Sequence, residues 1–213
     1  MQKNNLMLRW SSLLVSVLMA GAVAAADVTS ADPVVVVEST TREALKVLDQ
    51  RRAEFRADNE ALYRAIDELI LPVFDVQRAG DLVLGVHART ATVDQRKRFA
   101  QALYRSLVRQ YAAAVLDYTA DQLVVRPARG EADPRATRIE SEVKLTDGKT
   151  VLISYVLRQT DKGWKVFDVV AEGISYVRNF REQYNEEIAR RGLDAVIASM
   201  ERGEAPARPA NAA

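Results

Sequence analysis

The chain has 213 residues, with 30 Lys and Arg against 29 Asp and Glu, one His, no Cys and 48% hydrophobic residues. This composition is typical of a folded globular protein. Without cysteine the chain can form no disulfide, no thiolate zinc site and no cysteine nucleophile, and one histidine excludes most histidine-based metal sites. The net charge of +1 gives no overall attraction to nucleic acid, so we expect no nucleic-acid partner, no metal and no cofactor.

The N-terminus has the three parts of a cleaved secretory signal peptide. Lys3 and Arg9 supply a positive start, residues 13–20 form an apolar run, and Ala24-Ala25-Ala26 offers a cleavage site of small residues. The apolar run is shorter than the roughly 20 residues needed to cross a bilayer. We therefore expect cleavage after Ala26 and export of a soluble product. The predicted organisation is a signal peptide over 1–26, a flexible segment over 27–39, one domain over 40–202 and a disordered tail over 203–213.

The first half of the domain carries helical patterns. Thr40 and Glu43 have the spacing of a capping box, in which two side chains satisfy free backbone donors of a first turn, so a helix should follow. A second helix is predicted after Asn59, as a candidate N-cap, with a boundary at Pro72.

Two further helices precede the sheet. Residues 76–84 form a short helical segment that ends at Gly85, where a left-handed cap suits glycine. Thr92 and Gln95 form another capping box, which opens what should be the longest helix of the chain.

From about residue 121 the apolar period changes from helical to two, which is typical of strands with one buried face. The expected strands cover 122–126, 138–145, 150–158 and 164–170, with turns at Asp147-Gly148 and 160–163. A helix follows Gly173 and ends at Gly192, and a short helix covers 193–200. The sequence therefore predicts an α+β fold, with helices covering one face of a curved antiparallel sheet of about four strands.

Two residues could carry enzyme chemistry. His87 is the one possible histidine base, but no nucleophile motif accompanies it, so we interpret it as a loop residue. Asp168 is predicted on the same side of its strand as Trp164 and Val166, where an apolar cavity could raise its pKa for proton transfer. The alternative is that Asp168 hydrogen-bonds the backbone or an arginine such as Arg178.

The first half of the predicted longest helix is basic. It could contact a lipid phosphate, an anionic membrane surface or an acidic partner, or it could simply be a solvated face. The residues concerned are Arg96, Lys97, Arg98, Arg105 and Arg109.

Several stretches resemble one family. They are Leu71-Pro72-Val73-Phe74-Asp75-Val76, then 79–85 (AGDLVLG), then Ala91-Thr92 with Gln95-Arg96 and Phe99, and finally 163–175 (GWKVFDVVAEGIS). The last motif, which runs into the helix Val177-Arg178-Asn179-Phe180-Arg181, is the most specific. From about residue 40 to 202 the chain is similar to the MlaC family of periplasmic phospholipid-binding proteins, also called the toluene-tolerance family.

This resemblance implies a fold like nuclear transport factor 2 (NTF2-like), a cone with an apolar cavity that takes a phospholipid by its acyl chains as cargo. It implies a non-enzymatic periplasmic carrier that shuttles lipid between membranes and maintains outer-membrane lipid asymmetry. The implied partners are the outer-membrane lipoprotein MlaA with its porin, and an inner-membrane MlaFEDB-type ABC transporter through its MCE-domain subunit. We expect a monomer.

Residue type and helix or strand face give a set of candidates for the lining of the acyl pocket. They are Leu69, Ile70, Val73, Phe74, Leu103, Leu107, Tyr111, Val143, Ile153, Tyr155, Leu157, Trp164, Val166, Ile174 and Val177. Periodicity cannot separate a lined pocket from a filled core. An isomerase-type enzyme that uses Asp168 and a secreted adaptor with a filled core therefore stay open as alternatives.

Overall fold

A computed structural model describes residues 32–116, 120–126 and 131–204. The predicted signal peptide, and the predicted tail beyond Glu204, lie outside these ranges. The elements in chain order are α1 (Pro33–Ala57), α2 (Asn59–Ile70), α3 (Val76–Leu84), the 3-10 helix η1 (Gly85–Arg89), α4 (Val93–Val115), β1 (Ala120–Arg126), β2 (Thr137–Leu145), β3 (Thr150–Thr160), β4 (Gly163–Ala171), β5 (Ile174–Ser175), α5 (Tyr176–Arg191) and α6 (Leu193–Glu201). The predicted α+β class is confirmed. No helix within the described ranges combines the length and the apolar character that a membrane span requires.

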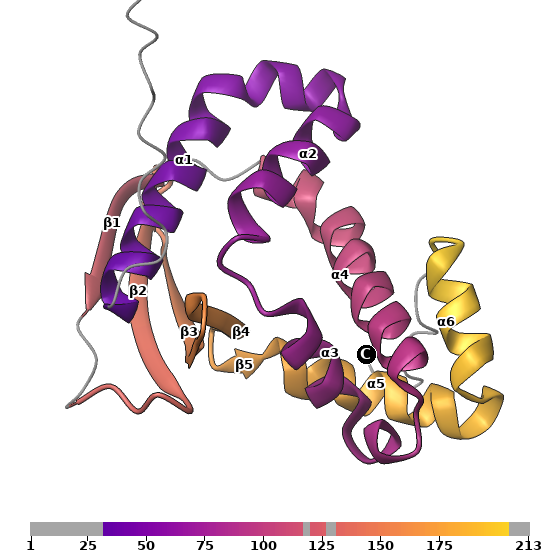
Figure 1. Ribbon diagram of the computed structural model, residues 1–213. Coiled ribbons are helices and arrows are strands. Elements are labelled where there is room, and N and C mark those ends of the chain that lie inside the picture. Colours follow the sequence, from indigo (N-terminus) through magenta and orange to yellow (C-terminus); the bar gives the residue numbers. More distant parts are fainter. Residues whose placement is uncertain (1–31, 117–119, 127–130, 205–213) are drawn as a thin grey trace, which may run out of the picture.

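The strands form one antiparallel sheet in the order β1-β2-β3-β4-β5. The predicted turn at Asp147-Gly148 joins β2 and β3, and Gly148 has a φ of +86° that glycine adopts without strain. Sequence reasoning missed the two-residue β5, which folds back on β4 after Gly173. Figure 1 shows the sheet at one side of the molecule and α3 to α6 at the other, with α1 running from the sheet to the helical side.

Cross-strand pairing places most of the predicted sheet residues on one face. Ile139 of β2 pairs with Tyr155 of β3, and Thr137 pairs with Leu157. Val166 of β4 pairs with Leu157, which puts it on the same face. Since alternate residues of a strand share a face, this face also carries Val143, Ile153 and Trp164.

A β-bulge overturns the predicted position of Asp168. The register shifts so that Val156 pairs with Asp168 while the next residue of β3, Leu157, pairs with Val166. The extra residue in β4 is Phe167, and such an insertion moves the following side chains to the other face. Asp168 therefore lies on the face opposite to Val166, and the prediction that they share a side was wrong.

The first helix begins earlier than predicted. Asp32 is its N-cap and accepts a hydrogen bond from the Val34 amide at 2.8 Å, with Pro33 in the first turn. Val36 and Val37 are buried against the sheet, and this burial stabilises the additional turns. A start after Thr40 was therefore wrong, as was the prediction of the longest helix, because α1 has 25 residues and α4 has 23.

The other helix ends follow local chemistry more closely. The capping box of α4 is present, since the Gln95 amide donates to Thr92 Oγ1 at 3.1 Å and the Thr92 amide donates to Gln95 Oε1 at 2.9 Å. The N-cap of α2 is Asp58 rather than Asn59, and its carboxylate accepts from two backbone amides. The predicted bounds of α3 are confirmed, with Gly85 at a φ of +56°.

Candidate functional site

The buried apolar side chains of the described residues form three clusters rather than one. The sheet cluster is Val36, Val37, Val73, Ile139, Leu157, Trp164 and Val166. The lower helical cluster joins α3, α4, α5 and α6 around Phe99, Leu84, Phe180, Tyr184 and Ile197. The upper helical cluster joins α1, α2 and the end of α4 around Phe55, Leu62, Ala65 and Ala112. A single domain usually has one contiguous core, so the large apolar side chains that these clusters leave incompletely covered mark the candidate site.

Nine of the fifteen predicted lining residues belong to these clusters or pack against them. Val73, Leu157, Trp164 and Val166 lie in the sheet cluster, with Phe74 and Tyr155 packed against it. Leu103 and Val177 lie in the lower helical cluster, and Leu107 packs against it. Phe74 packs against both clusters and so joins the sheet to the helices.

The remaining predicted residues belong to no cluster. Leu69, Ile70 and Ile153 are half-buried, Val143 is buried, Tyr111 is 36% exposed and Ile174 is 61% exposed. Leu107 is also only half-buried, although it packs against the lower helical cluster. We call these incompletely covered residues the apolar belt: Leu69, Ile70, Leu107, Tyr111, Ile153 and Ile174. These large apolar side chains come from α2, α4 and the sheet and are left incompletely covered by the protein's own packing.

The sheet part of the belt lies along one line across the strands. Ser141 pairs with Ile153, Ile153 with Ala171 and Ala171 with Ile174. The neighbouring line, which contains Tyr155, is covered by α1, since Tyr155 packs against the sheet cluster and its hydroxyl lies 3.5 Å from Thr41 Oγ1. α1 thus covers the part of this face that carries Tyr155, whereas along the neighbouring line Ile153 is half-buried and Ile174 is 61% exposed.

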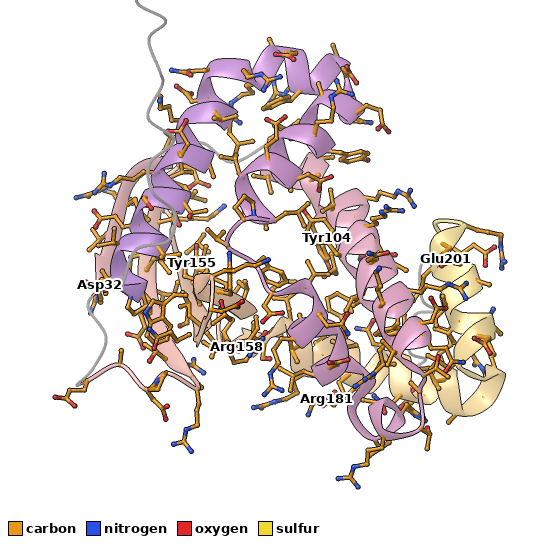
Figure 2. The ribbon with its side chains drawn as sticks, viewed as in Figure 1. Asp32, Tyr104, Tyr155, Arg158, Arg181 and Glu201 are labelled. Atoms are coloured by element: carbon orange, nitrogen blue, oxygen red, sulfur yellow. The ribbon has the colours of Figure 1, made fainter. Side chains whose placement is uncertain are left out.

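The segment before α3 fixes this arrangement. Phe74 forms a parallel bridge with Val166, because the Asp75 amide donates to the Val166 carbonyl at 2.7 Å and the Val166 amide donates to the Val73 carbonyl at 2.8 Å. The Asp75 carboxylate accepts from the Arg78 amide at 2.9 Å and from Arg158 Nε at 2.7 Å. Figure 2 shows Arg158 between the strands and α3. Residues 73–75 therefore connect β4 and β3 of the sheet to the start of α3.

Side chains also tie the helices to one another. The Tyr104 hydroxyl of α4 donates to Asp67 Oδ1 of α2 at 2.7 Å, and burial followed by this bond raises the pKa of the Tyr104 phenol. Arg181 Nε donates to the Leu82 carbonyl at 2.6 Å, and Asn185 Nδ2 donates to the Val83 carbonyl at 3.0 Å. These bonds satisfy free carbonyls at the end of α3.

The Asp168 carboxylate accepts two hydrogen bonds from the start of α5 and the residue before it. Its Oδ2 accepts from the Ser175 hydroxyl at 2.6 Å, and its Oδ1 accepts from the Val177 amide at 3.0 Å. Ser175 in turn caps α5 by accepting from the Arg178 amide. Asp168 therefore hydrogen-bonds the backbone, as the alternative reading held, and organises the start of α5.

The other candidates for chemistry lie apart from the belt. His87 lies on η1, and its carbonyl accepts from the Thr90 amide at 3.2 Å. Among the basic residues of α4, Arg98 forms a bidentate pair with Glu201 of α6, at 2.9 and 2.7 Å. Glu201 lies at the outer side of the molecule (Figure 2), and the pair lowers the pKa of its carboxyl. Over the described ranges, no group of three or more metal-ligating side chains is placed to hold an ion.

A row of aromatic rings was missed by sequence reasoning. Phe99, Tyr184, Phe180, Tyr176 and Tyr111 follow one another with ring centroids 5.4, 6.3, 6.1 and 5.8 Å apart. Spacing of four residues along α5 could have indicated three of them, but the contacts with α4 depend on the packing of two helices.

Comparison of the sequence with known proteins identifies its family and several relatives. The family model described as MlaC protein matches residues 38–202. Toluene tolerance protein ttg2D of Pseudomonas putida is 30% identical over 160 residues, which are 75% of this chain and 74% of that protein. The intermembrane phospholipid transport system binding protein MlaC of Haemophilus influenzae is 21% identical over 196 residues, or 91% and 92% of the two chains.

A solved structure agrees with these sequence matches. The phospholipid-binding protein of Ralstonia solanacearum, solved in complex with a phospholipid, superposes with a TM-score of 0.73 at 20% identity, over 82% of this chain and 96% of that one. The resemblance found from the sequence motifs is therefore confirmed. The chain belongs to the MlaC protein family.

Proposed function

We propose that this protein is a non-enzymatic carrier that binds a phospholipid by its acyl chains and moves it between the inner and outer membranes. The observation that carries the proposal is the apolar belt, a set of large apolar side chains from α2, α4 and the sheet that the three clusters leave half-buried or exposed. Family membership and the related protein solved with a phospholipid support it. The lining residues predicted from the sequence are the proposed contacts with the chains.

A carrier of this kind answers a physical need. Two acyl chains hold about 30 methylenes, and at about 0.8 kcal/mol each their exposure to water costs on the order of 20 kcal/mol. A free phospholipid therefore crosses an aqueous gap slowly. An apolar sleeve replaces the bilayer around the tails, while the charged headgroup stays in water because its unpaired burial would be costly.

The alternatives have less support. An isomerase would need Asp168 inside the apolar space, but the bulge turns it to the opposite face and its oxygens accept from Ser175 and Val177. An adaptor with a filled core would leave no reason for Leu69, Ile70 and Ile153 to lie outside every cluster.

The proposed compartment is the periplasm, reached through the signal peptide over residues 1–26. The name of the Haemophilus influenzae relative, an intermembrane transport protein, supports this placement. The proposed partners are MlaA with its porin at the outer membrane and an MlaFEDB-type ABC transporter, through its MCE-domain subunit, at the inner membrane. Maintenance of outer-membrane lipid asymmetry would follow.

The test is organic extraction and mass spectrometry of the mature protein purified from a Gram-negative host without added lipid. About one phospholipid per protein molecule is the expected result. Protein that is folded by circular dichroism and that neither carries nor takes up phospholipid from vesicles would overturn the proposal.

A further inference from the structure

The aromatic row runs from the core to the surface. Phe99 and Tyr184 are 0% and 1% exposed, Phe180 is buried, Tyr176 is half-buried and Tyr111 is 36% exposed. Tyr111 and Tyr176, which we call the tyrosine pair, meet edge to face with their ring centroids 5.8 Å apart and an interplanar angle of 86°. Burial, which is the larger cause, and the neighbouring Tyr176 raise the pKa of the Tyr111 phenol.

Within the residues that the structure describes, the hydroxyls of the tyrosine pair have no protein partner. Neither forms a hydrogen bond or ion pair with any residue of 32–116, 120–126 or 131–204. Tyr104, on the same helix as Tyr111, shows the contrast, because its hydroxyl donates to Asp67 at 2.7 Å. Among the described residues, two neighbouring phenols are thus left without a protein acceptor.

Each tyrosine of the pair is close in the chain to other residues of the apolar belt. Tyr111 belongs to the belt and lies one helical turn beyond Leu107 on α4. Tyr176 begins α5, two residues after Ile174, whose strand partner Ala171 pairs with Ile153. The pair is therefore next to belt residues along the chain, and it is only partly covered, since Tyr111 is 36% exposed and Tyr176 is half-buried. Tyrosine is also enriched at the boundary of a bilayer, which is apolar on one side and wet on the other.

We propose that the hydroxyls of Tyr111 and Tyr176 donate hydrogen bonds to the phosphate of the bound phospholipid and so hold its headgroup at the mouth of the apolar space. This inference rests on the proposed carrier function. The phosphate is the expected acceptor because an ionised oxygen accepts more strongly than an ester carbonyl. The headgroup stays hydrated, and only its position is set by the protein.

The test compares release of two lipids to acceptor vesicles of dioleoyl phosphatidylcholine. Delipidated protein is loaded with dioleoyl phosphatidylglycerol, or with dioleoylglycerol, which has the same chains and no phosphate. Tyr111→Phe and Tyr176→Phe should each speed release of phosphatidylglycerol about tenfold or more, the effect of losing one hydrogen bond to a charged group. Release of dioleoylglycerol should not change. Tyr63→Phe, which removes a phenol hydroxyl from a residue packed against the upper helical cluster, is the control and should leave both rates as in the wild type.

The outcomes separate this inference from the carrier function. Phosphatidylglycerol release that is unchanged in both variants, or that rises equally with dioleoylglycerol release, overturns the inference while the carrier function stands. Wild-type protein that loads neither lipid overturns the carrier function and this inference with it.

Discussion

Removal of the Asp75 carboxylate should loosen the connection between the sheet and the helices. Asp75 accepts from the Arg78 amide and from Arg158, and its side chain is 12% exposed whereas that of Arg158 is 39% exposed. Loss of the cap costs about 1 kcal/mol. Loss of the charge-assisted bond costs about 1.5 kcal/mol, the low end of its range, because solvent screens the guanidinium. Asp75→Ala should therefore lower the free energy of unfolding by about 2.5 kcal/mol.

Asp75→Asn separates the two contributions, because an amide oxygen can still cap α3 but carries no charge. Its expected loss is about 1.5 kcal/mol. Urea unfolding followed by circular dichroism measures both variants, with Glu43→Gln as a control that breaks only the exposed pair with Lys46. An Asp75→Asn variant as stable as the wild type would refute the reasoning on the ion pair. An Asp75→Ala variant no less stable than Asp75→Asn would refute the reasoning on the cap.

Three further predictions concern packing, pH and lipid retention. A Cβ at Gly80 would lie 2.5 Å from the Cβ of Ala100 on α4. Gly80→Ala should therefore lower the free energy of unfolding in urea by about 1–3 kcal/mol, although alanine has the better helix propensity. A variant as stable as the wild type, or more stable, would contradict this close approach. The Arg202 guanidinium holds the pKa of the Glu204 carboxyl at about 2, below the roughly 4.3 of an unfolded chain. The stability that this ion pair contributes is therefore present above about pH 4.3 and is lost as the pH falls toward 2. The difference in Tm between wild type and Glu204→Gln should shrink over that window, and a difference independent of pH would count against the bond. Leu107→Asp should lower the lipid content of the folded protein, because it places an unpaired charge against the acyl chains. The control Gln110→Asp, at an exposed position of the same helix, should leave the lipid content unchanged. Equal lipid content in the two variants would exclude Leu107 from the lining.

Local chemistry predicted the elements whose ends are marked in the sequence. The bounds of α3 were correct because Gly85 ends it with a positive φ, and the start of α4 was correct because Thr92 and Gln95 cap it reciprocally. The alternation in β2 predicted its buried face, since Ile139 and Val143 are both buried.

The features that sequence reasoning missed depend on contacts across the chain. The early start of α1 requires burial of Val36 and Val37 against the sheet, and a run of four valines carries no clear helical signal by itself. The bulge at Phe167 changes the face of Asp168, because one inserted residue reverses a period of two. The tyrosine pair depends on how α4 and α5 pack, which neither helix specifies alone.

The same limit applies to the candidate site. Strand faces correctly grouped Ile153, Leu157 and Trp164, but periodicity could not separate residues that fill a cluster from those left outside every one. Ile174 illustrates this difference, since it was predicted as lining and is 61% exposed. The incomplete cover of Ile153 becomes apparent only when the three clusters are located.

The central claim is that acyl chains lie against Ile153 on the helix-facing side of the sheet. Two adjacent residues of β3 test it, because Ile153 faces the helices and Leu152 faces the other way and is 51% exposed. The measurement is photo-crosslinking in cells with p-benzoylphenylalanine in place of either residue, followed by mass spectrometry of the protein. The account predicts a covalently attached phospholipid from position 153 and none from position 152. No lipid adduct at position 153, or equal adducts at both, would contradict it.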